Sequence, residues 1–83
     1  MNHIIECAYV SEYRLLLTFS DGSRKIVDMM PYLKGEIFEP LKDVNVFKTV
    51  RLNEVFHTIE WPNGADMCPD VLYEIGTEIS KTA

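Results

Sequence analysis

The sequence has little of several features that would narrow its function, and each scarcity excludes a class of protein. Only two of the 83 residues are cysteines, Cys7 and Cys68. A small secreted domain that depends on disulfides usually carries more, so we expect two half-buried free thiols in a cytoplasmic protein. No apolar run approaches the ~18–20 residues of a membrane span. The N-terminal MNHIIECAYV also lacks the basic and apolar regions of an export signal.

Basic residues are scarce in the last thirty positions. Residues 1–53 hold seven acidic and seven basic side chains, whereas residues 54–83 hold six acidic ones and a single base, Lys81. The net charge of −5 therefore comes entirely from the C-terminal part of the chain. Because that part would repel a phosphate backbone, we expect no direct binding of nucleic acid.

The composition that is present indicates one folded domain. Hydrophobic residues make up 47% of the chain and charged residues 25%, which is typical of globular proteins. No internal repeat, low-complexity segment or linker divides the chain, so residues 1–83 are expected to form a single small domain. A domain of this length can bury a modest core between one sheet and a helix or two.

Alternating apolar residues predict an antiparallel sheet of about five strands, arranged as a meander of hairpins. The strands are expected over residues 3–10, 13–19, 24–29, 49–53 and 55–61. In the second strand, one face is expected to carry Tyr13, Leu15, Leu17 and Phe19. In the fifth strand, one face is expected to carry Val55, His57, Ile59 and Trp61, after a tight turn at Asn53-Glu54.

The hairpin between the second and third strands is signalled by Asp21-Gly22, because glycine tolerates the positive φ of a tight turn. The length of its loop stays open. That length decides whether Ile26 or Val27 faces the core, since a shift of one residue moves every side chain to the other face.

Residues 30–48 fit neither the strand period nor the helix period. Pro31, Gly35 and Pro40 interrupt them, yet apolar residues recur throughout. We expect short helical turns whose apolar side chains cover one face of the sheet.

A C-terminal helix is predicted over residues 69–75. Pro69 suits the first helical position, and Asp70 in the first turn complements the helix dipole. Cys68 should lie just outside the helix, because the residue before a proline avoids the helical region. Gly76 either ends the helix or is tolerated within a longer one. The predicted fold is therefore α+β, with short helical turns in the middle and one C-terminal helix.

The block WPNGAD, residues 61–66, is interpreted mainly as a turn. Gly64 is expected at positive φ after the fifth strand. Asp66 is the one residue of the block without a structural task.

Catalytic, metal and cofactor sites are not predicted. His3 and Cys7 stand four apart, which on a strand separates them by ~13 Å. Nucleophilic catalysis would need Cys7 or Cys68 beside His57. Cys68, at a helix N-terminus, is the better placed of the two, but no third orienting residue is indicated. We therefore expect a protein that is not an enzyme.

Candidate binding residues fall in the same C-terminal region. Trp61 is expected to pack against the helix, with ligand stacking as the alternative. Acidic residues recur around the helix, and would line one face of it if it continued past Gly76. These residues are Asp66, Asp70, Glu74 and Glu78. They form either a solvated surface or a docking face for a partner with a basic surface.

Three stretches, FSDGS, VDMMPYL and IEWPNGADMCPDVLYE, resemble a known family. Over residues 4–75 the chain is similar to the small bacterial domain-of-unknown-function family 2442. The resemblance implies a compact α+β domain with an antiparallel sheet and a C-terminal helix, and no catalytic residue or cofactor.

The resemblance also implies two settings for such domains. Some members look fused to a helix-turn-helix domain, a variant that is not expected here because this chain stops at Ala83. Others look paired with a second small protein, as in toxin–antitoxin or regulatory pairs.

The function predicted from the sequence is a non-enzymatic cytoplasmic interaction module, one half of a small two-gene pair. The alternative is a domain that senses a small ligand on the face near His57 and Trp61. Neither the partner, the ligand nor the oligomeric state follows from the sequence.

Overall fold

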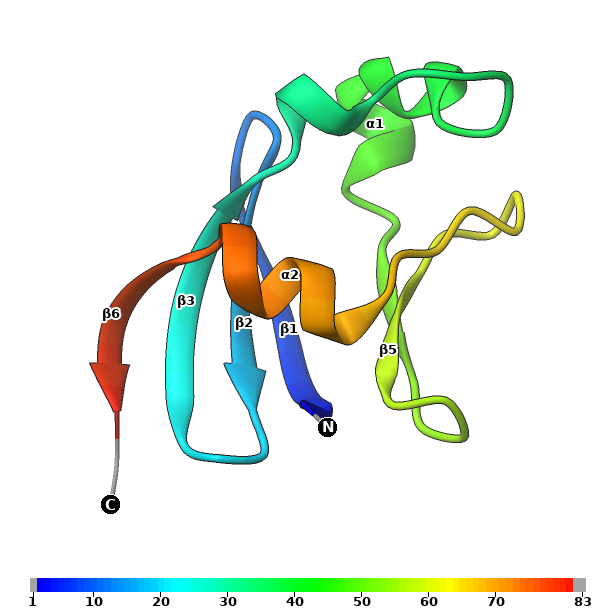
Figure 1. The fold of residues 1–83 in the computed structure, drawn as a ribbon. Helices are drawn as coiled ribbons and strands as arrows, with labels where there is room; N and C mark the ends of the chain where they lie inside the picture. The colour runs from blue at the N-terminus through cyan, green and yellow to red at the C-terminus, as the bar shows by residue number, and fades with distance from the viewer. Residues whose placement is uncertain (1, 82–83) are drawn as a thin grey trace.

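Four antiparallel strands form the main sheet of the computed structural model, which describes residues 2–81 (Figure 1). Across the sheet they run in the order β1 (Ile4–Ser11), β2 (Arg14–Phe19), β3 (Ser23–Asp28) and β6 (Thr77–Lys81). The first three strands form the two predicted hairpins. The strand β6 was not predicted. It follows the C-terminal helix and pairs with β3.

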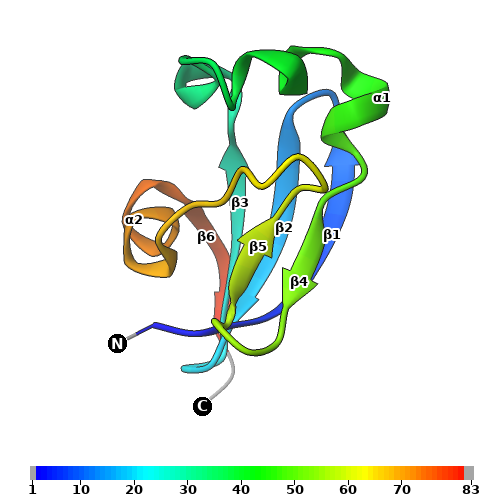
Figure 2. The same ribbon diagram turned by 90° about the vertical axis from the view of Figure 1, so that its right-hand side faces the viewer.

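Two shorter strands form a separate sheet. They are β4 (Arg51–Asn53) and β5 (Thr58–Glu60), which pair antiparallel. The α+β class is confirmed, but a single sheet of five consecutive strands is wrong. The long connection after β3 lets the β4–β5 hairpin contact β1 instead of extending the main sheet (Figure 2).

The fifth strand is also shorter than predicted. Residues 54–57 form a turn, and β5 begins only at Thr58. His57 has a positive φ of 57°, which no regular strand residue adopts. The expected alternation from Val55 to Trp61 is therefore wrong for Val55 and His57, both of which are exposed.

The middle of the chain forms short helical turns, as predicted. They are η1 (Met30–Tyr32), η2 (Glu39–Lys42) and α1 (Val44–Phe47), and they gather at one end of the main sheet (Figure 1). Asp43 caps α1, because its Oδ1 accepts a hydrogen bond from the Asn45 backbone N–H at 2.9 Å. Leu33, Leu41 and Phe47 from this region are fully buried.

The C-terminal helix α2 (Pro69–Ile75) has the predicted bounds. Cys68 precedes it in an extended conformation, as a residue before proline should. The helix ends at Gly76, which settles the alternative left open by the sequence. A Cβ at Gly76 would lie 2.9 Å from the Lys25 Cβ, so only glycine lets β6 leave the helix this close to β3. No helix among residues 2–81 is long and apolar enough to cross a membrane.

The core lies between the main sheet on one side and α2 with the β4–β5 hairpin on the other (Figures 1 and 2). From the sheet it receives Leu15, Leu17, Phe19 and Val27, all fully buried. Val27 rather than Ile26 therefore faces the core. Trp61 fills the centre at 1% exposure, and its Nε1 donates to the Phe47 carbonyl at 2.7 Å.

Candidate functional site

The residues that the sequence singled out for binding do not form one cluster. Trp61 is buried, so in this conformation its ring offers no surface to a ligand. Asp66 is exposed and forms an isolated bridge with Glu60 of β5. Asp70 lies in the first turn of α2, where its Oδ1 accepts a hydrogen bond from the Asn2 backbone N–H at 3.0 Å. Glu74 is exposed on the same helix.

A helical acidic stripe that includes Glu78 is wrong. Because α2 ends at Ile75, Glu78 lies on β6, in register with Lys25 of β3. Asp70 and Glu74 remain one turn apart on α2, and Asp66 precedes the helix.

A different feature stands out at the tip of the β4–β5 hairpin. Val55 and Phe56 are 78% and 73% exposed, more than any other large apolar side chain of the described residues. Ile5 on the neighbouring strand β1 is 49% exposed. Isolated exposed apolar residues are ordinary, but two adjacent ones at the tip of a turn are the kind of feature that marks an interaction site.

Asn53 fixes the backbone of this tip. Its Oδ1 accepts hydrogen bonds from the backbone N–H groups of Val55 and Phe56, both at 2.9 Å. Its carbonyl accepts from the His57 N–H at 2.8 Å. Three hydrogen bonds to one residue hold the turn in a single shape, so Val55 and Phe56 project from an ordered backbone.

Glu60 supports Asn53 from the opposite strand. The Asn53 Nδ2 donates to Glu60 Oε1 at 2.7 Å, and the Arg51 Nε donates to Glu60 Oε2 at 2.9 Å. These hydrogen bonds, that from Asn53 first and that from Arg51 second, hold the pKa of the Glu60 carboxyl below its ordinary value. The ionised Glu60 carboxylate thus orients the Asn53 side-chain amide, and that amide orients the backbone of the turn.

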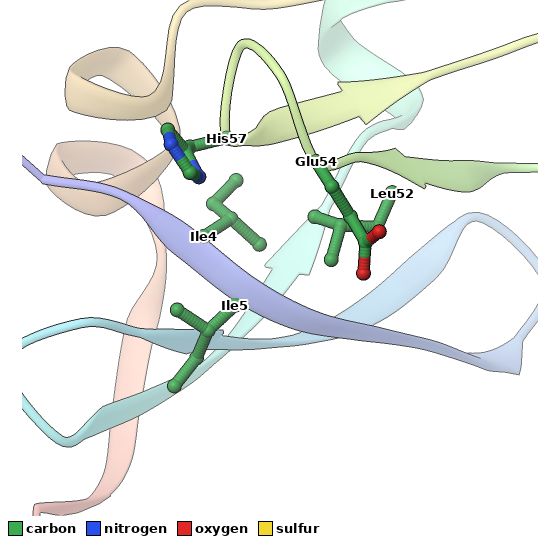
Figure 3. A pocket seen from close by; sticks show the side chains of 5 residues that line it. All are labelled: Ile4, Ile5, Leu52, Glu54 and His57. Carbon is green, nitrogen blue, oxygen red and sulfur yellow. The ribbon is translucent and has the colours of Figure 1, made fainter.

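Beside the tip lies a shallow hollow of about 240 Å³ (Figure 3). Figure 3 shows β1 on one side of it and the hairpin on the other. Its lining is largely apolar, and Glu54 is its acidic member. The lining residues are Ile4, Ile5, Leu52, Glu54 and His57.

Two contacts join the hairpin to the start of β1. The Ile4 N–H donates to the His57 carbonyl at 2.9 Å. The rings of His3 and His57 stack with centroids 4.4 Å apart and an interplanar angle of 11°. The hollow is therefore bounded by two segments that are tied to each other.

The cysteines differ from each other. Both are free thiols, as expected, but Cys68 is exposed rather than half-buried. Burial raises the pKa of the Cys7 thiol. Within residues 2–81, no hydrogen bond joins either thiol to a histidine, and no three potential ligands gather as a metal site would require.

Sequence reasoning missed the tip itself. It placed a turn at Asn53-Glu54 but assigned Val55 and Phe56 to the strand, because apolar residues usually mark buried positions. An Asn side chain can accept hydrogen bonds from the backbone N–H groups two and three residues later in the chain. Asn53 was therefore the available signal for a longer turn.

Comparison with known proteins identifies the chain at the level of a family. No curated protein and no solved structure matches it. The model of one protein family, described as "Protein of unknown function (DUF2442)", matches residues 4–78. That match covers almost the whole sequence, and the chain therefore belongs to the DUF2442 family.

Proposed function

We propose that this protein is a non-enzymatic protein-interaction module of the cytoplasm and that the tip of the β4–β5 hairpin is its docking element. The observation that carries the proposal is the combination of exposure and order at Val55 and Phe56. Both side chains are more than two thirds exposed, yet Asn53 holds their backbone with two hydrogen bonds. A preordered aromatic anchor loses little entropy on binding, which is the usual property of an interface hot spot.

The chemistry of the partner follows from the surroundings of the tip. The hollow beside it is apolar, with Ile5 half-exposed on its wall and Glu54 at its rim. The chain as a whole carries a net charge of −5. We therefore propose a partner protein with a basic surface, in which an apolar side chain lies next to a lysine or arginine that reaches Glu54.

The exposed acidic residues near α2 have a separate part in this proposal. Asp66, Asp70 and Glu74 would attract a basic partner over distances of about a Debye length and so speed its association. They lie on the part of the chain that follows β5, and Asp66 is bridged to β5 itself.

Sensing of a small ligand is the weaker candidate. The hollow includes His57, as that hypothesis requires, but Trp61 is buried away from it. Its volume of about 240 Å³ falls below the ~300–1,000 Å³ of typical ligand pockets. An open hollow of this size suits one side chain of a partner better than a whole metabolite.

The experiment is to capture the partner on the immobilised protein, identify it, and measure its affinity with purified components. Phe56→Ala should weaken binding at least tenfold, about the effect of losing one hot-spot anchor. Ile37→Ala is the matched control, since Ile37 is 45% exposed and lies outside the hairpin. Equal affinities for the wild type and Phe56→Ala would refute the docking role of the tip.

A further inference from the structure

The main sheet has a second face that points away from the core. Leu15, Leu17 and Phe19 of β2 are fully buried, so Leu16 and Thr18 between them point to the opposite side. Their register partners on neighbouring strands share that side. We call this surface the outer face. It includes Glu6, Ala8, Ser11, Arg14, Leu16, Thr18, Arg24, Ile26, Asp28, Thr77 and Ser80.

No described element covers the outer face. The helix α2 and the β4–β5 hairpin both lie on the inner side of the main sheet, and the helical turns gather at its end (Figures 1 and 2). At its centre three apolar side chains stand in one row across neighbouring strands, namely Ala8, Leu16 and Ile26. Nothing in residues 2–81 packs on that row.

The charges of the outer face distinguish it from the rest of the molecule. It carries two acidic residues, Glu6 and Asp28, and two basic ones, Arg14 and Arg24. The face is thus neutral on a chain whose net charge is −5. Neither a strongly basic nor a strongly acidic partner gains from such a surface, whereas a surface with the same alternation can match it.

The register makes the outer face complementary to itself. Consider a two-fold axis parallel to the strands, midway between β2 and β3. It places β2 of one copy over β3 of the other, because the four strands are spaced evenly at ~4.8 Å. Leu16 of each copy then faces Ile26 of the other copy, since the two residues are register partners in one row.

The same axis brings opposite charges near one another. Arg14 and Asp28 are register partners, so each faces the other across the interface. Within its own chain, Arg14 Nη1 also donates to Glu12 Oε1 at 2.9 Å. Arg24 stands over Thr18 of the second copy, and Glu6 is the register partner of that Thr18 on the adjacent strand. Strands one position apart differ by only ~4.8 Å, which a long arginine spans. No like charges stand directly over each other, and the two copies of Arg24 lie one strand position apart, as far as each lies from Glu6 of the other copy.

We infer that the outer face is the interface of a two-fold homodimer in which two main sheets pack face to face. Such sheets lie ~10 Å apart and cross at about 30°, as in a β-sandwich. The four-strand face measures roughly 20 Å by 20 Å by strand spacing and rise. That extent is below the ~800 Å² per partner of a standard interface. The dimer is therefore a weak one, with a dissociation constant in the micromolar range or above.

Sedimentation velocity over about 10 µM to 1 mM tests the inference, a range chosen for a weak complex. The wild type should pass from monomer to dimer within it. Leu16→Lys should abolish the dimer, because it puts a charge in the centre of the apolar row. Val71→Lys should not, since Val71 is an exposed apolar residue of α2, on the inner side.

Charge reversals test the symmetry. Glu6→Arg and Arg24→Glu should each raise the dissociation constant at least tenfold, because each opposes like charges across the interface. An equimolar mixture of the two variants should restore the dimer. In the mixed pair, Arg24 of one chain lies near Glu6 of the other. The two substituted side chains, which are opposite in charge, lie near each other in the same way. Circular dichroism confirms that each variant is folded.

Three results would overturn the inference. One is a wild type that stays monomeric throughout the concentration range. Another is a Leu16→Lys variant that dimerises like the wild type. The third is a mixture of the two reversal variants that stays monomeric. The double variant Val55→Lys, Phe56→Lys separates this inference from the proposed function, since it should lose the partner and keep the dimer. Loss of the dimer in that variant would show that the dimer interface lies at the hairpin and not on the outer face.

Discussion

At the scale of single residues, two glycines close to α2 are required for different reasons. Gly64 adopts a φ of +93°, as the sequence predicted, in the turn where its N–H donates to the Trp61 carbonyl at 2.9 Å. A Cβ there would meet only the Ile37 Cδ1, at 3.8 Å, so space is available. Gly76 has an ordinary φ, but a Cβ added at this position would lie 2.9 Å from the Lys25 Cβ.

Substitution by alanine separates the two causes. Gly64→Ala should lower the free energy of unfolding by about 1 kcal/mol, through backbone strain alone. Gly76→Ala should cost more, about 1–3 kcal/mol, because the helix and β3 must move apart. Urea denaturation at equal protein concentration measures both. A Gly64→Ala variant as stable as the wild type would contradict a strained turn.

At the scale of elements, the hairpin network makes part of the stability depend on pH. The pKa of Glu60 is lowered in the folded protein, by Asn53 first and Arg51 second, from an ordinary value of 4.5. A carboxyl of this kind stabilises the fold at pH values above its unfolded pKa, and the contribution disappears as the pH falls through the lower folded value. The loss therefore occurs below about pH 4.5.

Glu60→Gln tests this dependence. The variant should be less stable than the wild type at about pH 7, and the difference should shrink as the pH falls below about 4.5 and through the lowered pKa of Glu60. Thermal unfolding across this range measures it. Glu54→Gln is the control, since Glu54 is exposed on the same hairpin and makes no hydrogen bond to Asn53. A stability difference that is constant with pH would contradict the role of the carboxylate.

The elements also show which parts of the fold the sequence could predict. Local signals were sufficient for the hairpin of β2 and β3, for the start of α2 at Pro69, and for the turn at Gly64. The strand β6 has only Ile79 as a large apolar residue, so no alternation indicated it. Its pairing with β3 depends on contacts between residues about fifty positions apart, which a local pattern does not contain.

The candidate site was less predictable for a related reason. Apolar character predicts burial, and at Val55 and Phe56 that rule fails. Which charges share the outer face also depends on register. Glu6 and Arg24 are both register partners of Thr18 only in the observed alignment of β1, β2 and β3. Trp61 was expected to pack against the C-terminal helix. It is buried, and its ring lies against Phe47 of α1, with centroids 5.6 Å apart and its Nε1 donating to the Phe47 carbonyl.

At the scale of the whole molecule, the proposed docking tip and the outer face occupy opposite sides of the main sheet. Occupation of one therefore leaves the other free. A two-fold dimer would present two hairpin tips, and a partner with two binding segments would bind with higher avidity than either segment gives alone.

The acidic residues act at this largest scale, and position can be separated from net charge. Glu74→Lys and Glu36→Lys each change the net charge by the same amount, from exposed positions without an ion pair among the described residues. Glu74 lies on α2, close after Asp66 and Asp70, whereas Glu36 lies between η1 and η2. If the acidic residues near α2 guide a basic partner, Glu74→Lys should slow association several-fold more than Glu36→Lys.

Surface plasmon resonance with the captured partner measures these rates. The wild-type association rate should fall as salt rises from about 50 to about 500 mM, because the Debye length shortens about threefold. Glu74→Lys should reduce that salt dependence, while its melting temperature stays close to that of the wild type, since an exposed reversal on a seven-residue helix changes stability by only a few tenths of a kcal/mol. Equal rates for the two reversals, or rates that do not depend on salt, would reduce the acidic residues to a solvated surface and leave the hairpin tip as the sole determinant of binding.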